Sequence, residues 1–199
     1  MSDGSTSAAE AKKALRSKLL AARARIPPEA RGEKSRAIAD RLEALAQFRD
    51  ARVVALYAPL GTEVDALEIA RRAAARGATV VYPRATAGER RLAFARCAPS
   101  ELVRGPFGAG EPPAASPEVA PGDVGCVVVP GVGFSEDGHR LGRGGGHYDA
   151  TLEAVPGAAR IGVAFDAQVV PALPREPHDA PLDALVTESR TLAFPRDSR

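Results

Sequence analysis

Residues 52–83 read RVVALYAPLGTEVDALEIARRAAARGATVVYP, and this stretch carries the strongest indication of the fold. The run 53–57 is short and apolar, which predicts a buried strand rather than a helix. Residues 65–76 repeat apolar side chains at helical spacing, and residues 79–82 form a second apolar run that we expect to end at Pro83. A strand, a helix and a strand in this order predict a parallel pair joined by a right-handed crossover.

Further apolar runs follow this unit along the chain, at residues 92–96, 126–129, 160–165 and 184–187. Because most of them are nearly continuous rather than alternating, they are typical of parallel strands buried on both faces. We therefore expect a Rossmann-like α/β fold, with three αβα layers around a central, mostly parallel sheet. Ligands of such sheets bind beyond the carboxyl ends of the strands. Residues 104–123 are rich in glycine and proline and predict a long irregular loop.

Two amphipathic helices are expected before the first strand. The apolar stripe of the first is made by Leu15, Leu19, Ala22 and Ile26. The stripe of the second is made by Ile38, Leu42, Leu45 and Phe48. Pro27 and Pro28 separate the two helices, and Pro28 suits the first turn of the second helix. Residues 1–6 are small and mostly polar, and we expect them to form a mobile tail.

The composition is that of a globular domain. The chain has 199 residues, of which 45% are hydrophobic and 26% charged, and this predicts one domain over residues 1–199. Because 27 Lys and Arg nearly balance 25 Asp and Glu, the net charge of +2 gives no general case for binding nucleic acid or a membrane surface. The basic first helix also lacks the interleaved aromatic residues of a nucleic-acid site.

The cysteines and the apolar runs indicate the compartment. Cys97 and Cys126 are too few for a disulfide framework or a four-thiolate zinc site, and their sequence context predicts inert thiols. A reducing cytoplasm is their simplest location. No run approaches the ~18 consecutive apolar residues of a membrane span, and residues 1–13 lack the apolar core of a signal peptide. We therefore expect a cytoplasmic protein.

A glycine-rich segment carries the strongest indication of chemistry. The strand at 126–129 leads to a Pro130-Gly131 corner, and RLGRGGGHYD follows at residues 140–149 and opens a helix. Glycines let a backbone approach a ligand closely, and successive amides in such loops, together with a helix N-terminus, bind anions. Arg140 and Arg143 can fork onto phosphate oxygens, and Asp149 offers a hard oxygen to Mg²⁺.

This segment matches neither common phosphate-binding motif. It lacks the Lys-Ser/Thr pair that follows the last glycine of a P-loop, and its glycines do not have the spacing of a dinucleotide-binding loop. From the spacing alone, a flexible glycine loop with solvated arginines stays open as an alternative.

The segment does resemble the signature of a known family, 5-formyltetrahydrofolate cyclo-ligase (5,10-methenyltetrahydrofolate synthetase). The family's RLGxGxGYYD pattern is matched at residues 140–149, within a PGxxFxxxGxRLG frame that begins at Pro130. Lys12-Lys13-Ala14-Leu15-Arg16 resembles its KxxLR start. Weaker matches are Glu63-Val64-Asp65, His178-Asp179 and Thr187-Glu188. The resemblance spans residues 11–190, which is most of the chain.

The resemblance implies an enzyme that uses ATP and Mg²⁺ as cofactors and a small molecule, 5-formyltetrahydrofolate, as substrate. In this family the formyl oxygen attacks the γ-phosphoryl group, which gives a phosphorylated formyl intermediate. The second folate nitrogen then closes the ring to 5,10-methenyltetrahydrofolate, and ADP and phosphate are released. We expect a monomer or a weak homodimer that binds no nucleic acid and no membrane.

The resemblance also implies roles for individual residues. ATP would contact Lys12, Lys13, Arg16, Arg140, Leu141, Gly142, Arg143, Gly144, Gly145, Gly146, His147 and Tyr148. The folate would contact Ala58, Glu63, Arg143, Gly144, Gly145, Gly146 and His147. Mg²⁺ would be held by Asp149 and Asp179, and the catalytic residues would be Arg143 and Tyr148.

Several of these residues have simpler interpretations. Lys12 and Arg16 lie four positions apart and are also typical of a solvated helix face, while Glu63 is also typical of a helix start. Asp179 is also typical of a turn. His147 replaces the family's usual tyrosine, and this departure favours one alternative function, a non-catalytic folate- or nucleotide-binding regulator of the same fold.

Overall fold

The computed structural model describes residues 8–176 and 179–195, so the expected tail at residues 1–6 lies outside the described residues. An eight-stranded sheet runs through the molecule in the order β13-β12-β10-β7-β1-β2-β3-β6. Its strands are β1 (Val53–Ala55), β2 (Thr79–Ala85), β3 (Leu92–Arg96), β6 (Glu118–Val119), β7 (Cys126–Val129), β10 (Ala159–Val163), β12 (Ala184–Val186) and β13 (Thr191–Ala193). From β12 to β2 neighbouring strands are parallel, and the pairs toward both edges are antiparallel.

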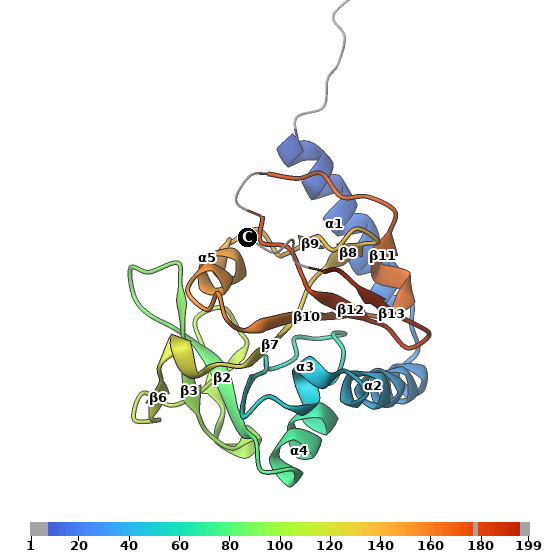
Figure 1. Cartoon of the computed structure of the whole chain (residues 1–199). Coiled ribbons are helices and arrows are strands. Elements are labelled where there is room, and N and C mark those ends of the chain that lie inside the picture. The colour runs from blue at the N-terminus through green and yellow to red at the C-terminus, as the bar shows by residue number, and fades with distance from the viewer. Residues whose placement is uncertain (1–7, 177–178, 196–199) are drawn as a thin grey trace, which may run out of the picture.

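Helices cover both faces of this sheet and give the three layers expected from the sequence (Figure 1). One face carries α2 (Pro28–Glu43), α3 (Ala46–Arg49) and α4 (Leu67–Ala75), whose apolar side chains share a buried cluster with Val54 and Val128. The other face carries α5 (His147–Glu153), where Leu152 packs with Val127 and Val129. The central strands are buried between these layers, which is why their sequences are nearly continuous apolar runs.

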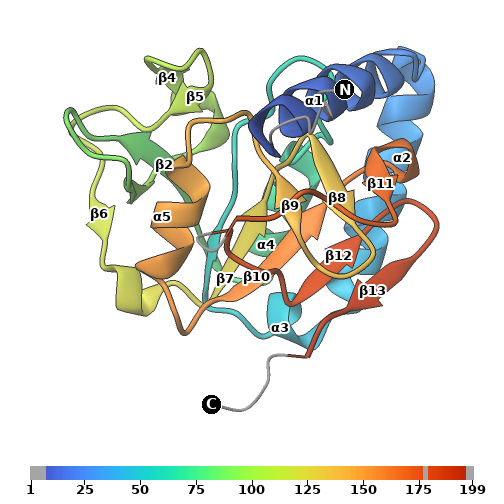
Figure 2. The ribbon, with the colours of Figure 1, turned by 90° about the horizontal axis from the view of Figure 1, so that it is seen from above.

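The N-terminal helix α1 (Ala8–Ala24) packs on a second, smaller sheet. That sheet has the order β11-β8-β9, with β8 at Gly133–Ser135, β9 at Arg140–Leu141 and β11 at Val169–Val170. Leu19 of α1 and Leu141 belong to a small apolar cluster of their own, and in the view from above α1 lies close to this sheet (Figure 2). The two N-terminal helices predicted from the sequence are confirmed, and α2 begins with Pro28 in its first turn. Their predicted stripes were too long, because α1 ends before Ile26 and α2 ends before Leu45, and both side chains pack against the main core instead.

The prediction that Phe48 continues the stripe of the second helix was wrong. Helix α2 ends at Glu43, and Phe48 belongs to the separate short helix α3. Phe48 is nevertheless fully buried, because the chain turns at Leu45 and directs this ring into the core from a new axis.

The prediction that the second strand ends at Pro83 was also wrong, because β2 runs on to Ala85. Strand β1 pairs with β2 only as far as Val81, and beyond that point β2 pairs with β3 alone. Proline lacks an amide hydrogen, but a strand segment with one open edge tolerates it.

Residues 104–123 are more ordered than the predicted irregular loop. Short strands β4 (Val103–Arg104) and β5 (Gly110–Glu111) form a hairpin, and β6 adds to the edge of the main sheet beside β3. Short 3-10 helices lie at Pro99–Glu101, Pro121–Asp123 and Asp166–Gln168. Among the described residues, no helix combines the length and the apolar character needed to cross a lipid bilayer.

The topology fixes where a ligand can bind. From the neighbouring strands β1 and β7 the chain leaves in opposite directions, through α4 to β2 and through α5 to β10. The loops that follow β1 and β7 therefore diverge and leave a crevice at the carboxyl ends of these strands.

Candidate active site

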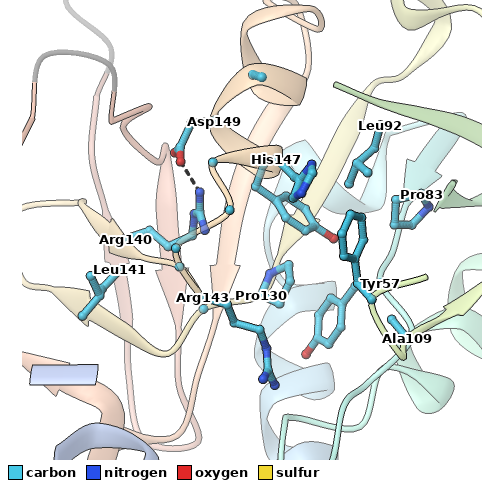
Figure 3. A pocket seen from close by; sticks show the side chains of 18 of the residues that line it. Tyr57, Pro83, Leu92, Ala109, Pro130, Arg140, Leu141, Arg143, His147 and Asp149 are labelled. Atoms are coloured by element: carbon cyan, nitrogen blue, oxygen red, sulfur yellow. Dashed lines mark hydrogen bonds and ion pairs between the residues drawn. The ribbon is translucent and has the colours of Figure 1, made fainter. Parts of the chain in front are cut away.

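A cavity of about 610 Å³ lies at this crevice and is lined from both sides of it. Tyr57, Ala58 and Glu63 come from the loop after β1, and Pro130 and Gly131 come from the corner after β7. All of the signature residues 140–149 line the same cavity. Figure 3 shows Arg143, Pro130 and Tyr57 facing a common space, with His147 above it.

The predicted site residues gather here almost completely. The cavity is lined by Lys12, Arg16, Ala58, Glu63, Arg140, Leu141, Gly142, Arg143, Gly144, Gly145, Gly146, His147, Tyr148, Asp149 and Asp179. Lys13 is the exception, because it lies exposed on α1 and does not line the cavity. His178, matched to the family's closing pair, lies outside the described residues.

The glycine-rich loop adopts a conformation that other residues rarely reach. Gly144 has φ of 107° and Gly146 has φ of 68°, both in the left-handed region. Gly146 is also the residue from which α5 begins, and no side chain caps that helix end. The backbone amides at the start of α5 are therefore not capped by a side chain where the loop meets the cavity.

Arg140 is the most deeply buried cation of the signature, with a side chain that is 4% exposed. Its Nη2 donates to Oδ1 of Asp149 at 2.7 Å, as the dashed line in Figure 3 marks, and its guanidinium carbon lies 5.5 Å from the centre of the Tyr148 ring. Its Nε is buried and has no hydrogen-bond partner among the described residues. A buried donor without a partner is rare, and it fits a site that binds an anion.

The hydroxyl of Tyr148 stays protonated, and therefore uncharged, in this environment. Burial raises the pKa of Tyr148 far above its ordinary value, and the nearby positive charge of Arg140 only partly opposes this effect. The group can therefore donate a hydrogen bond at neutral pH.

Glu63 and Arg143 bridge the cavity from opposite sides. Nη2 of Arg143 lies 2.8 Å from Oε1 of Glu63, and Oε2 of Glu63 accepts the backbone N–H of Leu60 at 2.9 Å. The Glu63 side chain is 8% exposed, whereas that of Arg143 is 53% exposed. A buried carboxylate held by a backbone N–H thus faces a half-exposed cation.

Helix α1 brings two further cations to the loop and its surroundings. Lys12 donates to Glu176 at 2.5 Å and to Asp179 at 2.9 Å. Burial by itself would lower the pKa of Lys12, but these two hydrogen bonds outweigh it and the pKa is raised. Nε of Arg16 donates to the carbonyl of Gly142 at 2.8 Å, so α1 holds the glycine-rich loop directly.

The two aspartates matched to metal ligands offer a partial coordination shell. Among the described residues, no group of three or more His, Cys, Asp and Glu side chains gathers as a metal cage. Arg140 engages Oδ1 of Asp149, and Lys12 engages Oδ2 of Asp179. Two carboxylates that line one cavity are ligands of the kind that suits Mg²⁺, because this ion takes one or two protein carboxylates and completes its shell with phosphate oxygens and water.

The sequence did not predict several residues that line or support the cavity, and four of them make contacts with predicted site residues or their partners. They are Arg23, Arg90, Phe107 and Glu176. The backbone carbonyl of Arg90 lies 2.8 Å from Nδ1 of His147, and the Phe107 ring lies 4.5 Å from the His147 ring. Phe107 belongs to the stretch assigned to an irregular loop, so only its exposed aromatic character was a signal.

The cysteines take no part in this site. Cys126 is buried in β7, and burial raises its pKa to about 12. Burial also raises the pKa of Cys97. Both sulfurs therefore stay protonated at neutral pH, as the prediction of inert thiols requires.

Comparisons with known proteins agree with the signature. The model of the 5-formyltetrahydrofolate cyclo-ligase family matches residues 8–188. A 5-formyltetrahydrofolate cyclo-ligase of Mycolicibacterium smegmatis is 32% identical over 185 residues, which cover 90% of this chain and 94% of that protein. An Escherichia coli protein of the same name is 33% identical over 172 residues, covering 83% of this chain and 93% of that protein.

The fold agrees as well. The NMR structure of Aquifex aeolicus 5,10-methenyltetrahydrofolate synthetase superimposes with a TM-score of 0.81 at 35% sequence identity, and the match covers 94% of each chain.

Proposed function

The chain belongs to the 5-formyltetrahydrofolate cyclo-ligase family, and from this premise we propose that it converts 5-formyltetrahydrofolate to 5,10-methenyltetrahydrofolate with ATP and Mg²⁺, releasing ADP and phosphate. The observation that carries this proposal is the single cavity in which the glycine-rich loop, its arginines and the buried carboxylate of Glu63 meet. Transferring a phosphoryl group from a nucleotide to a folate requires both ligands in one site, because the reacting atoms must lie in contact.

The glycine-rich loop is the proposed triphosphate site. Left-handed glycines expose backbone amides to phosphate oxygens, and the guanidinium of Arg140, which lines the cavity, adds a charged donor. Arg16 holds the loop through the Gly142 carbonyl, and Lys12 holds Asp179 beside it. ATP, when bound there, supplies the phosphoryl group that turns the formyl oxygen into a leaving group.

Asp149 and Asp179 are the proposed metal ligands. Mg²⁺, when bound, would neutralise charge on the phosphates. Arg140 orients Asp149 through its Oδ1, and Lys12 orients Asp179 through its Oδ2. The side chains of Arg140 and Lys12 thereby fix the direction in which each carboxylate faces the cavity.

The folate side of the cavity is formed by Ala58, Glu63 and the loop residues from Arg143 to His147. Pterin rings present N–H donors, and the buried carboxylate of Glu63 is an acceptor for them. The rings of Phe107 and His147, tilted by 45° to each other, add a half-exposed aromatic wall that suits an aromatic ligand.

Arg143 and Tyr148 are the proposed catalytic groups. The formyl oxygen forms a bond to the γ-phosphorus while the bond from that phosphorus to the β–γ bridging oxygen breaks, so that ADP leaves and a phosphorylated formyl intermediate remains. The second folate nitrogen then attacks the formyl carbon and loses its proton. The carbon–oxygen bond breaks, and phosphate leaves with that oxygen. Arg143, on the glycine-rich loop, neutralises charge on the transferring group, and the protonated Tyr148 donates a hydrogen bond.

We also propose that the enzyme works in the cytoplasm as a monomer or weak homodimer and binds neither nucleic acid nor a membrane. The free thiols of Cys97 and Cys126 fit a reducing compartment. The single-domain organisation of residues 1–199 stays a prediction.

A direct assay tests the function. Purified protein with 5-formyltetrahydrofolate, ATP and Mg²⁺ is expected to show the absorbance rise of the methenyl product, with one phosphate released per ring closed. Omitting ATP or chelating Mg²⁺ is expected to abolish the rise. Tight folate binding without turnover would instead support the non-catalytic regulator, for which the replacement of tyrosine by His147 is the favouring observation.

A further inference from the structure

Helix α1 presents three cationic side chains on one face. Lys12, Arg16 and Arg23 are spaced by four and seven residues, which at about 3.6 residues per turn places them within roughly 40° of one another. Lys12 and Arg16 serve the nucleotide half of the cavity through Asp179 and Gly142. Arg23 lies further along the same face and reaches the other half.

The Arg23 side chain is 3% exposed and ties three segments together. Its Nε donates to Oγ1 of Thr62 at 3.0 Å, and its Nη1 donates to the carbonyl of Gly131 at 3.4 Å. The same Nη1 lies 3.8 Å from Oε1 of Glu63. The guanidinium therefore joins α1 to the loop after β1 and to the corner after β7.

Burying this cation is costly, and packing does not require it. Burial lowers the pKa of Arg23, and the carboxylate of Glu63 opposes that effect. Replacing both members of a buried ion pair by apolar groups is often neutral or stabilising, so packing alone does not call for the pair of Arg23 and Glu63, whereas removing Arg23 alone would leave the buried carboxylate with one partner fewer. A role in binding accounts for the charge better than a role in stability.

The two arginines that face Glu63 differ in burial and in the element that carries them. Arg143 is 53% exposed and lies on the glycine-rich loop, whereas Arg23 is buried on a long helix. Both approach the same oxygen, Oε1. If Arg143 turned from Glu63 to bind a phosphate, Arg23 would stay buried beside the carboxylate. Arg23 is therefore the partner that Glu63 keeps in both situations.

We propose that Arg23 is a positioning residue that holds the Glu63 carboxylate in the orientation that receives the folate. The inference rests on the proposed folate-binding role of Glu63 and extends it to a residue outside the family signature. Arg23 acts through Glu63 and touches neither ligand's reacting atoms. Its loss therefore weakens folate binding and leaves nucleotide binding unchanged.

The test measures equilibrium binding of 5-formyltetrahydrofolate and of a non-hydrolysable ATP analogue separately, by calorimetry. Arg23→Met is expected to weaken folate binding about tenfold or more and to change nucleotide binding less than about twofold. Arg25→Met, at an exposed position just after the helix, is the matched control and is expected to change neither. Because binding is read without turnover, the result stands even if the ring-closure reaction fails.

A double-mutant cycle separates positioning from general structure. If Arg23 acts through Glu63, Arg23→Met has no further effect on folate binding in a Glu63→Gln background. Arg23→Lys, which keeps the charge but cannot reach three acceptors, is expected to lose less affinity and serves if Arg23→Met does not fold. Unchanged folate affinity, equal weakening of both ligands, or full additivity with Glu63→Gln would overturn the proposal.

Discussion

Arg143 and Glu63 form an ion pair whose two side chains differ in burial, and this difference determines the effect of substituting either one. The arginine is half exposed on a loop, while the carboxylate is buried in the wall of the cavity. Removing the arginine leaves a cavity that is otherwise intact, because Arg23 still lies beside Glu63. Function and stability are therefore separable at this position.

Arg143→Ala is expected to lower kcat by about 100-fold or more, because a charge that stabilises the transferring phosphoryl group is lost. The free energy of unfolding in urea is expected to change by less than about 1 kcal/mol, since Arg143 itself is half exposed and Glu63 keeps Arg23 and the Leu60 N–H as partners. Arg91→Ala removes a similarly exposed arginine that does not line the cavity and is expected to leave kcat unchanged. A comparable loss in both variants would argue against a catalytic Arg143.

Asp149→Asn changes two properties at once. It weakens the proposed Mg²⁺ site and removes the negative charge beside the buried Arg140. We expect the Mg²⁺ concentration for half-maximal activity to rise about tenfold and the free energy of unfolding to fall by about 1.5–3 kcal/mol. Asp123→Asn, in an exposed turn, is the control for both measurements. An unchanged Mg²⁺ requirement would remove Asp149 from the metal site.

At the residue scale the sequence predicted most of the cavity wall, and the omission of Arg23 has a physical reason. Helical periodicity is read from apolar residues, so a buried cation on the apolar face looks like an interruption of the stripe. Its partners Thr62 and Gly131 lie far away along the chain and meet it only in the fold. The pairing of Phe107 with His147 was hidden for the same reason.

At the scale of elements, the glycine-rich loop and α5 depend on one backbone conformation. Gly146 has a positive φ and begins the helix, and a Cβ placed there meets nothing closer than 4.0 Å, at the Arg90 guanidinium. Any cost of a side chain at this position is therefore backbone strain rather than crowding.

Gly146→Ala is expected to lower the free energy of unfolding by about 1–2 kcal/mol, the cost of a left-handed conformation for an alanine. It is also expected to raise KM for ATP several-fold, because the loop relaxes away from its phosphate-binding shape. Gly157→Ala, at a surface turn without positive φ, is the matched control and is expected to change both quantities little. If Gly146→Ala bound ATP normally, the shape of this loop would not matter for the nucleotide.

The elements themselves could be predicted where local signals agree with tertiary structure. The unit β1-α4-β2 follows from two short apolar runs around an amphipathic segment, and Pro28 marks the start of α2. The prediction failed where the position of a strand in the sheet matters. We expected Pro83 to end the strand, but β2 has an open edge at this point and accommodates the proline. The β4-β5 hairpin consists of strands too short to have a period.

At the scale of the whole molecule, buried phenols and thiols set the alkaline limit of stability. Burial raises the pKa of Tyr82 to about 12 and that of Cys126 to about 12, and it raises those of Tyr57 and Tyr148 as well. Above pH ~10 the unfolded chain loses these protons while the folded chain keeps them, so stability that is fully present below that pH is lost as the pH rises.

We therefore expect the free energy of unfolding to fall steeply above about pH 10, with each such group contributing up to about 1.4 kcal/mol per pH unit. Tyr82→Phe removes one of these groups and is expected to flatten the slope by that amount between pH ~10 and pH ~12. Urea unfolding at several pH values measures it. An identical slope in wild type and Tyr82→Phe would show that this phenol does not titrate differently on unfolding.

The proposed reaction requires that the triphosphate of ATP binds to main-chain amides and guanidinium groups of the glycine-rich loop, next to the folate. A crystal structure with a non-hydrolysable ATP analogue tests this most directly. We predict that the triphosphate lies within hydrogen-bond distance of the backbone amides at Gly144–Gly146 and of Arg140 or Arg143. A structure in which this loop is empty and the triphosphate binds elsewhere would contradict the account.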